Sequence, residues 1–299
     1  MYLREFSFPD MDEEFTFFLN QKMTCYMDFY PFQVLSSAGL ERLVFEPVTI
    51  LCGGNGCGKT TALNVIAETL GADRDSPYNR SCFFPDYVKL CRAVRGEDEW
   101  QECRIITSDD VFDYMLDLRC INQGIDAERE RRFEEYLKLK YSRFQLQSLE
   151  DYEHLKRNNL AKRKTMSRFT QESLMDNAPE RSNGESAFMY FTEKIKDNGL
   201  YILDEPENSL SPRRQQELVS YIGDASRFFG CQFIISTHSP FVLALPGAKI
   251  YDLDENPPQV KPWTALSHVQ AYYRFFKKHE QELEREEGAA GGSAGENRE

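Results

Sequence analysis

A loop rich in glycine, placed between an apolar run and a helical pattern, constrains this chain more than any other feature. Its residues are Gly53-Gly54-Asn55-Gly56-Cys57-Gly58-Lys59-Thr60, a full match to the pattern GxxxxGK[ST]. The preceding run, Val48–Leu51, is typical of a strand buried on both faces. The following residues, Thr60–Leu70, repeat apolar side chains at helical spacing. Because strand, glycine loop and helix follow in this order, the sequence predicts a phosphate-binding loop.

Each residue type in this loop suits contact with a phosphate group. Glycines let backbone N–H groups wrap around an anion at the N-terminus of a helix. The amine of Lys59 is expected to reach the β and γ phosphates, and the hydroxyl of Thr60 to coordinate Mg²⁺. The predicted nucleotide-binding residues of the loop are Gly53, Gly54, Asn55, Gly56, Cys57, Gly58, Lys59, Thr60 and Thr61.

A second feature is a strand that ends in two acidic residues. The apolar run Leu200–Leu203 is followed by Asp204 and Glu205. A buried strand can deliver Asp204 to the Mg²⁺ side of a nucleotide, and Glu205 can then polarise an attacking water. The alternative is a strand end capped by solvated acids. Asp204 comes 145 residues after Lys59 and is followed by a predicted helix, and this context favours the metal and catalytic roles.

Two shorter motifs complete the set. Ser182-Asn183-Gly184-Glu185-Ser186 precedes a helix predicted from about Glu185, and by itself it is an ordinary helix cap that offers a hydroxyl and free N–H groups to an anion. The predicted strand Gln232–Ser236 runs into Thr237 and His238. A histidine at the carboxyl end of a parallel strand lies where open α/β sheets bind ligands.

In this order, the motifs resemble those of the ATP-binding-cassette (ABC) ATPases. GGNGCGKT resembles the Walker A loop, SNGES a divergent signature motif, YILDEP the Walker B strand, NSLSP the D-loop, and STHSP the histidine switch. The resemblance covers roughly residues 30–255. DEPENSLSP and STHSPFVLAL are more similar to the soluble branch than to transporter subunits. That branch includes RecF, the chromosome-maintenance heads and the OLD-type ATPases of phage defence.

The resemblance implies an α/β fold of the P-loop NTPase class. It implies an ABC-ATPase-like head with a mainly parallel sheet, an N-terminal antiparallel β portion and a helical insertion. We expect a single two-lobed domain over residues 1–285, in which residues 109–182 are the helical insertion leading to the signature motif. Residues 286–299 are small and polar, and we expect a disordered tail.

The resemblance also implies Mg²⁺-dependent ATP hydrolysis in a head-to-tail homodimer that holds two ATP molecules. Residues of one subunit would then face Ser182 and Gly184 of the other, and Asn208–Leu210 would run along the interface. The catalytic residues implied are Glu205, His238 and Lys59. The metal ligands implied are Thr60 and Asp204.

This chain departs from the ABC pattern at several positions. The signature has Asn183 and Glu185 where transporters carry glycine and glutamine. A clear glutamine loop is absent, and its candidates are Ser108, Asp109 or Gln101. The aromatic residue that stacks on adenine stays open, with Tyr30 and Phe32 as candidates.

The remaining patterns predict secondary structure. Strands are expected at Phe15–Leu19, Phe32–Leu35 and Leu43–Phe45, with further strands between Ser81 and Ile106. Residues 109–176 are expected to be mainly helical. Ser211-Pro212 predicts the start of another helix, since proline suits the first helical turn.

Composition limits the classes of partner. The formal charge of −13 argues against a surface that coats nucleic acid or anionic membrane non-specifically. Residues 155–168 are an exception, with six basic residues and no acidic residue. This run is either a solvated helix face or a nucleic-acid contact. Neither a run long enough to span a bilayer nor a secretory signal is evident, so we expect a cytoplasmic protein without membrane insertion.

The effector is expected to be another chain. The stretch from Lys59 to Ser182 is too short for long coiled-coil arms, and the stretch after His238 is too short for a nuclease domain. ATP-driven dimerisation would then regulate a partner encoded nearby, such as a nuclease or a DNA-related protein of phage defence. The alternatives are the nucleotide-binding subunit of an ABC transporter and a small-molecule or nucleotide kinase.

Overall fold

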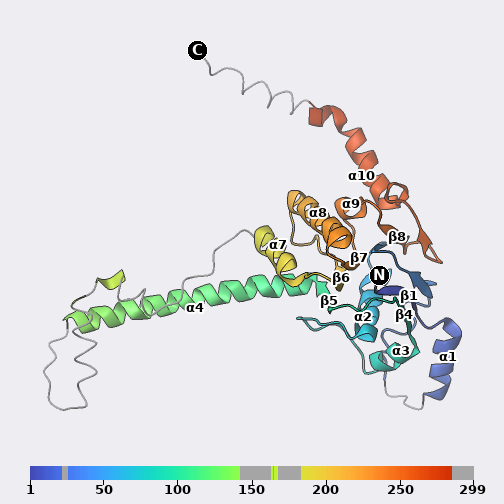
Figure 1. The fold of residues 1–299 in the computed structure, drawn as a ribbon, viewed down its shortest axis with the longest axis horizontal. Helices are drawn as coiled ribbons and strands as arrows, with labels where there is room; N and C mark the ends of the chain where they lie inside the picture. Colours follow the sequence, from blue (N-terminus) through green and yellow to red (C-terminus); the bar gives the residue numbers. More distant parts are fainter. Residues whose placement is uncertain (22–25, 142–162, 164, 168–182, 285–299) are drawn as a thin grey trace. The chain divides into compact units, whose positions relative to one another are not determined.

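A computed structural model describes residues 1–21, 26–141, 163, 165–167 and 183–284 (Figure 1). The chain divides into two compact units. The first unit comprises Met1–Asp110 and Phe191–Glu299, and the second comprises Val111–Tyr190.

A six-stranded sheet forms the centre of the first unit. Its strand order is β5-β6-β7-β3-β8-β9. The strands are β3 (Val48–Cys52), β5 (Glu102–Thr107), β6 (Gly199–Asp204), β7 (Gln232–Ser236), β8 (Lys249–Asp252) and β9 (Gln259–Val260). All neighbouring pairs are parallel except β8 and β9. Every residue of β3, β6 and β7 is buried, as their apolar runs predict. The predicted α/β fold with a mainly parallel sheet is therefore confirmed.

A smaller antiparallel sheet is formed by three strands from the first hundred residues. Its order is β2-β1-β4, from β1 (Leu3–Ser7), β2 (Arg42–Val44) and β4 (Arg92–Arg95). These strands confirm the predicted N-terminal antiparallel portion and the strand expected near Leu43–Phe45.

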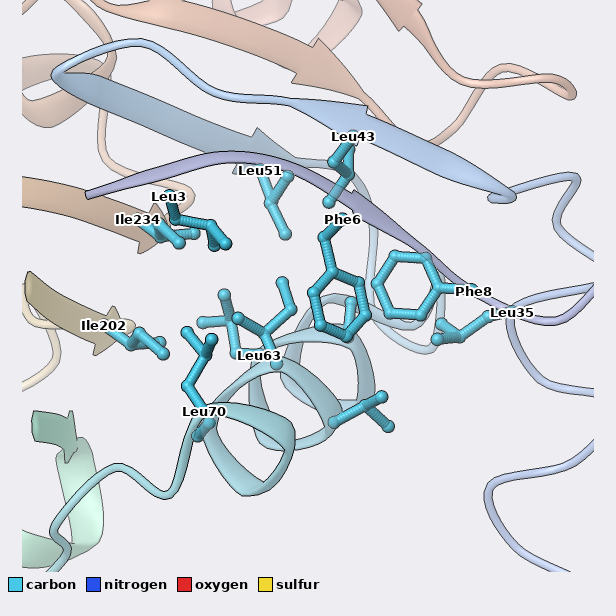
Figure 2. Close-up of a cluster of buried hydrophobic side chains, with 14 of the residues drawn as sticks. Leu3, Phe6, Phe8, Leu35, Leu43, Leu51, Leu63, Leu70, Ile202 and Ile234 are labelled. Atoms are coloured by element: carbon cyan, nitrogen blue, oxygen red, sulfur yellow. The ribbon is translucent and has the colours of Figure 1, made fainter. Parts of the chain in front are cut away.

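The core of the first unit gathers around helix α2 (Lys59–Leu70). Figure 2 shows Leu63 and Leu70 of α2 among side chains from both sheets, including Phe6 of β1 and Ile202 of β6. Nine of the helix's residues are buried, because apolar side chains occur on nearly all sides of it. The helix that begins at the glycine loop is thus held rigidly by the core.

Several other helices of this unit come after strands of the large sheet in the chain. They are α8 (Pro212–Phe228), α9 (Pro240–Leu243), the 3₁₀ turn η2 (Trp263–Ala265) and α10 (Ser267–Lys278). Helix α8 begins as predicted, because the Ser211 side chain accepts a hydrogen bond from the Arg214 N–H and proline occupies the first turn.

Two predicted strands in the first hundred residues are wrong, and the strand region expected between Ser81 and Ile106 is confirmed only in part, by β4 and β5. Phe15–Leu19 lies in helix α1 (Met11–Asn20), which begins with a capping box formed by Asp10 and Glu13. Phe32–Leu35 lies in turns, because the buried Glu14 carboxylate accepts hydrogen bonds from the Gln33 N–H and the Ser36 hydroxyl. Part of the expected strand region after Ser81 is helix α3 (Phe84–Leu90), which opens with a proline.

The second unit contains most of two helices, α4 (Ser108–Tyr141) and α7 (Asn183–Lys194). Helix α4 confirms the helical prediction for the described part of residues 109–176. Near the start of α7, the Asn183 Oδ1 atom accepts a hydrogen bond from Arg119 Nη2 at 2.7 Å. Residues 142–162, 164 and 168–176 lie outside the described part of the chain.

Candidate functional site

The glycine loop, the acidic pair and His238 follow strands that end at one edge of the large sheet. Strands β6, β7 and β3 are neighbours and run parallel, so their carboxyl ends lie together. Ser236 pairs in register with both Leu51 of β3 and Asp204 of β6. The glycine loop, the acidic pair and the histidine follow these three strand ends. This is the edge at which open α/β sheets bind ligands.

The glycine loop has the backbone needed to bind an anion. Gly56 and Gly58 have φ angles of 83° and 95°, in the left-handed region that favours glycine. Gly58 caps α2, and no side chain bonds the cap, so the first N–H groups of the helix face the loop. A Cβ atom at Gly58 would also come within 3.0 Å of Leu35 Cδ2. Glycine is therefore favoured there by its backbone conformation, and a larger residue would also have to displace the Leu35 side chain.

Lys59 lies across the loop. Its side chain is 5% exposed, and its Nζ atom donates hydrogen bonds to the carbonyl oxygens of Gly53 at 2.8 Å and Gly54 at 3.1 Å. Thr61 is buried, and its Oγ1 atom accepts a hydrogen bond from the Tyr30 hydroxyl at 3.0 Å. The loop thus presents one ammonium group and a helix N-terminus, both of which favour a bound phosphate.

A pair of oxygen atoms suits a hard cation. Thr60 Oγ1 donates a hydrogen bond to Asp204 Oδ1 at 3.2 Å, and the Ser236 hydroxyl donates to the same oxygen. Mg²⁺ prefers oxygen ligands and is commonly bound by one or two carboxylates together with phosphate oxygens. Burial raises the pKa of Asp204, while the hydrogen bonds from Ser236 and Thr60 lower it. A cation at this oxygen pair would favour the ionised carboxylate.

Glu205 is held beside His238. The Glu205 Oε1 atom lies 3.4 Å from His238 Nε2, and Asn208 Nδ2 donates a hydrogen bond to Glu205 Oε2 at 2.9 Å. Glu205 has a φ angle of 47°, a conformation uncommon for residues other than glycine. Within the described part of the chain, His238 Nε2 has no hydrogen-bond partner. The imidazole and the Glu205 carboxylate are therefore close to each other but are not joined by a hydrogen bond. The partly buried side chains of Glu205 and His238 therefore lie next to each other at this edge of the sheet.

The structure bears on two roles that the sequence left open, the glutamine-loop equivalent and the residue that stacks on adenine. Thr107 pairs in register with Asp204, so Ser108 follows the neighbouring strand at the correct edge. Gln101 precedes β5 and lies at the opposite, amino edge, where its N–H bonds the Asn198 carbonyl. Phe32 is 4% exposed and stacks on Phe17, so it belongs to the core and not to an adenine pocket.

The predicted roles of Ser182, Gly184 and the basic run 155–168 stay predictions. Ser182 lies outside the described residues, as does most of the basic run 155–168. Gly184 is described within the second unit.

In the described part of the chain, no helix has the length and apolar character to cross a membrane.

Sequence reasoning missed three residues at this edge. Glu207 accepts hydrogen bonds from the residues around His238, and Asp254 Oδ1 accepts one from the Gly54 N–H at 2.6 Å. His268 lies with its Nε2 atom 3.6 Å from Cys52 Sγ. Glu207 was visible in the motif after Glu205. No sequence pattern marks Asp254 or His268, which lie far along the chain from the residues that they contact.

Comparison with known proteins identifies a family for this chain. Residues 85–244, more than half of the chain, match the family described as "AAA domain, putative AbiEii toxin, Type IV TA system". The matched range contains β6, β7 and His238, and it begins after the glycine loop. A comparison with curated proteins finds no match.

Solved structures with similarity to this chain include a head domain and an ABC cassette. The Smc head domain of Pyrococcus furiosus, bound to the C-terminal domain of ScpA, is 14% identical over 80% of this chain and 95% of that chain, with a TM-score of 0.35. The ATP-binding cassette MJ0796, a dimer bound to ADP and Pi, is 13% identical over 76% of this chain and 91% of that chain, with a TM-score of 0.35. On the evidence of the family match, with the phosphate-binding loop and the acidic strand end meeting at one sheet edge, the chain belongs to this family of AAA domains and is a nucleotide-binding P-loop ATPase.

Proposed function

We propose that this protein hydrolyses ATP and that ATP binding drives its head-to-tail dimerisation, which regulates a partner effector. The observation that supports this most directly is the 3.2 Å contact between Thr60 Oγ1 and Asp204 Oδ1. It joins the phosphate-binding loop to the acidic strand end. A kinase also needs a phosphate loop, but the Glu205 and His238 pair at the same edge favours attack by water.

The chain's own residues bind and orient the nucleotide in this proposal. Lys59 and the N–H groups at the start of α2 hold the phosphates, and the 5% exposure of Lys59 makes its charge poorly screened. Thr60 and Asp204 would hold Mg²⁺, which when bound neutralises charge on the β and γ phosphates. In this role Lys59 gives up its bonds to the Gly53 and Gly54 carbonyls.

Glu205 acts as the general base that orients the attacking water. Its Oε1 atom faces His238 at 3.4 Å, while Asn208 fixes the other carboxylate oxygen at 2.9 Å. One carboxylate oxygen is therefore oriented by Asn208, and the other is left to accept a proton from water. His238 lies close enough to contact a group bound at Glu205.

The dimer brings the signature residues of a second copy to the nucleotide. Ser182 and Gly184 of that copy would donate hydrogen bonds to the γ phosphate, so that ATP and not ADP stabilises the dimer. Asn208, Ser209 and Leu210 follow β6 and would lie along that interface. We further propose that residues 1–285 act as one two-lobed ATPase domain.

The effector is proposed to be a separate chain. The description of the matched family names a toxin of a type IV TA system, which supports a role controlled by a partner. ATP-dependent dimerisation is a suitable signal for such a partner, because it changes which surfaces are exposed.

The proposal is tested with the variant Glu205→Gln. It removes the base but keeps the side chain's shape, so the variant should bind ATP, hydrolyse it at least about 100-fold more slowly and form a dimer. Oligomeric state is measured by size-exclusion chromatography with light scattering, with ATP and with ADP. Lys59→Ala is the matched control, and it should stay monomeric with either nucleotide.

Two outcomes would contradict the proposal. A Glu205→Gln variant that binds ATP but remains a monomer would remove the dimerisation mechanism. Undiminished turnover in Glu205→Gln would remove the catalytic role of this carboxylate, and with it the hydrolytic assignment of the site.

A further inference from the structure

One carboxylate oxygen organises the backbone around His238. Glu207 Oε1 accepts a hydrogen bond from the Thr237 hydroxyl at 2.6 Å. The same oxygen accepts from the backbone N–H groups of His238 at 2.7 Å and Ser239 at 3.1 Å. Three donors on one oxygen leave the loop after β7 little freedom to shift.

These bonds connect two strand ends that lie 30 or more residues apart in the chain. Glu207 follows β6 and comes two residues after Glu205, whereas His238 follows β7. Because Glu207 accepts a hydrogen bond from the His238 N–H, it fixes the position of His238 relative to Glu205 at the end of β6. The 3.4 Å approach of His238 Nε2 to Glu205 Oε1 depends on that relation.

A second polar link runs parallel to the first. The Ser239 hydroxyl donates to Gln215 Oε1 at 2.7 Å, and Gln215 Nε2 donates to the Leu210 carbonyl at 2.9 Å. Ser239 therefore makes two hydrogen bonds to residues that follow β6, one from its N–H to Glu207 and one from its hydroxyl to Gln215. Gln215 belongs to α8 and contacts no atom of His238 in any hydrogen bond of the described residues, so Glu207 is the more direct link.

The other oxygen of Glu207 points to a role beyond stability. Among the described residues, Glu207 Oε2 is buried and has no hydrogen-bond partner. A buried carboxylate oxygen without a donor destabilises a fold, and an apolar side chain would avoid that cost. The presence of a carboxylate at this buried position therefore calls for an explanation, and the three hydrogen bonds to the loop around His238 provide one.

We propose that Glu207 is a positioning residue that holds His238 in place for ATP hydrolysis, an inference that rests on the proposed function. Glu207 acts through the backbone of His238 and not on the nucleotide. Its loss should slow turnover without weakening ATP binding, because the groups of the glycine loop are untouched.

The test combines kinetics with a double-mutant cycle. Glu207→Ala should lower kcat by about 100-fold, as expected when a reacting group is displaced by about 1 Å. ATP affinity, measured by titration with a fluorescent nucleotide, should change by less than about threefold. In a His238→Ala background, Glu207→Ala should lower kcat by no more than about threefold further, since both substitutions remove one function.

A conservative variant and a control complete the design. Glu207→Gln keeps an acceptor oxygen but not its charge, so it should retain more activity than Glu207→Ala. Glu217→Ala removes a carboxylate of α8 that pairs with Arg213 and Arg214, and it should leave kcat unchanged. Hydrogen exchange of the His238 and Ser239 amides should accelerate in Glu207→Ala and not in Glu217→Ala.

The outcomes separate this inference from the proposed function. Additive effects of Glu207→Ala and His238→Ala, or unchanged exchange of the His238 amide, would overturn the positioning role. If Glu207→Ala fails to fold, the same cycle is measured with Glu207→Gln. Absence of ATP turnover in the unmodified protein would instead contradict the proposed function itself.

Discussion

His268 shows how a single residue of this protein responds to its surroundings. Its ring lies 6.5 Å from that of His238, measured between centroids, and its Nε2 atom is 3.6 Å from Cys52 Sγ. Burial lowers the pKa of His268 below its ordinary value, and the neighbouring His238 adds to the effect. The folded protein therefore favours the neutral imidazole.

This lowered pKa predicts a loss of stability in mild acid. As pH falls below 6.5, the ordinary value, the unfolded chain binds a proton at His268 that the folded chain resists. The free energy of unfolding should therefore decrease from pH 7.5 towards the lowered pKa, and level off below it. In His268→Gln this contribution is absent, so urea midpoints measured from pH 5 to 7.5 should fall less steeply. A slope equal to that of the unmodified protein would contradict the assignment.

At the scale of an element, helix α1 shows how a cap overrides an apolar pattern. The Asp10 side chain accepts a hydrogen bond from the Glu13 N–H at 2.8 Å, and the Asp10 N–H donates back to Glu13 Oε2 at 3.4 Å. The aromatic run Phe15–Leu19 predicts a strand if it is considered alone. The spacing of Asp10 and Glu13 was the sequence signal that could have corrected this prediction.

Removing this cap should destabilise the protein measurably. Asp10→Ala leaves N–H groups of the first turn without a partner, so the free energy of unfolding should fall by about 1 kcal/mol. Asp12→Ala is the matched control, because that side chain is an acidic residue of the same turn outside the capping box. It should cost less than about 0.5 kcal/mol. Equal losses in the two variants, measured by chemical denaturation, would show that the capping box contributes nothing specific.

At the scale of the whole molecule, α2 connects the two sheets of the first unit. The hydrophobic core around it includes Leu3 and Phe6 of β1 together with Ile202 and Ile234 of the large sheet. The helix that starts at the phosphate-binding loop is thus buried on most of its surface. Any movement of the loop must therefore be accommodated by this core.

Truncation in this core should have a large effect. Leu63 is fully buried on α2 in the core that includes residues of both sheets, so Leu63→Ala removes buried methyl groups and leaves a cavity. The free energy of unfolding should fall by about 2–5 kcal/mol. Glu68→Ala, on the exposed side of the same helix, should cost less than about 1 kcal/mol. Similar urea midpoints for the two variants would contradict the central role of α2.

The sequence by itself determined the local parts of the candidate site. The glycine loop, the fully buried strands β6 and β7, and the start of α8 follow from short-range rules: glycine for positive φ, continuous apolar runs for buried strands, and Ser-Pro for a helix start. These rules act within a few residues, so the pattern along the chain is sufficient to apply them.

Only the tertiary structure decided which of these parts meet. Thr60 and Asp204 are 144 residues apart in the chain, and they touch because β3 and β6 both flank β7 in the sheet. The same strand order placed Glu207 on the His238 loop, excluded Gln101 from the site, and brought Asp254 to the glycine loop. Strand order depends on how the whole sheet packs against α2. Such packing joins residues that are far apart in the chain, so it leaves no local pattern in the sequence.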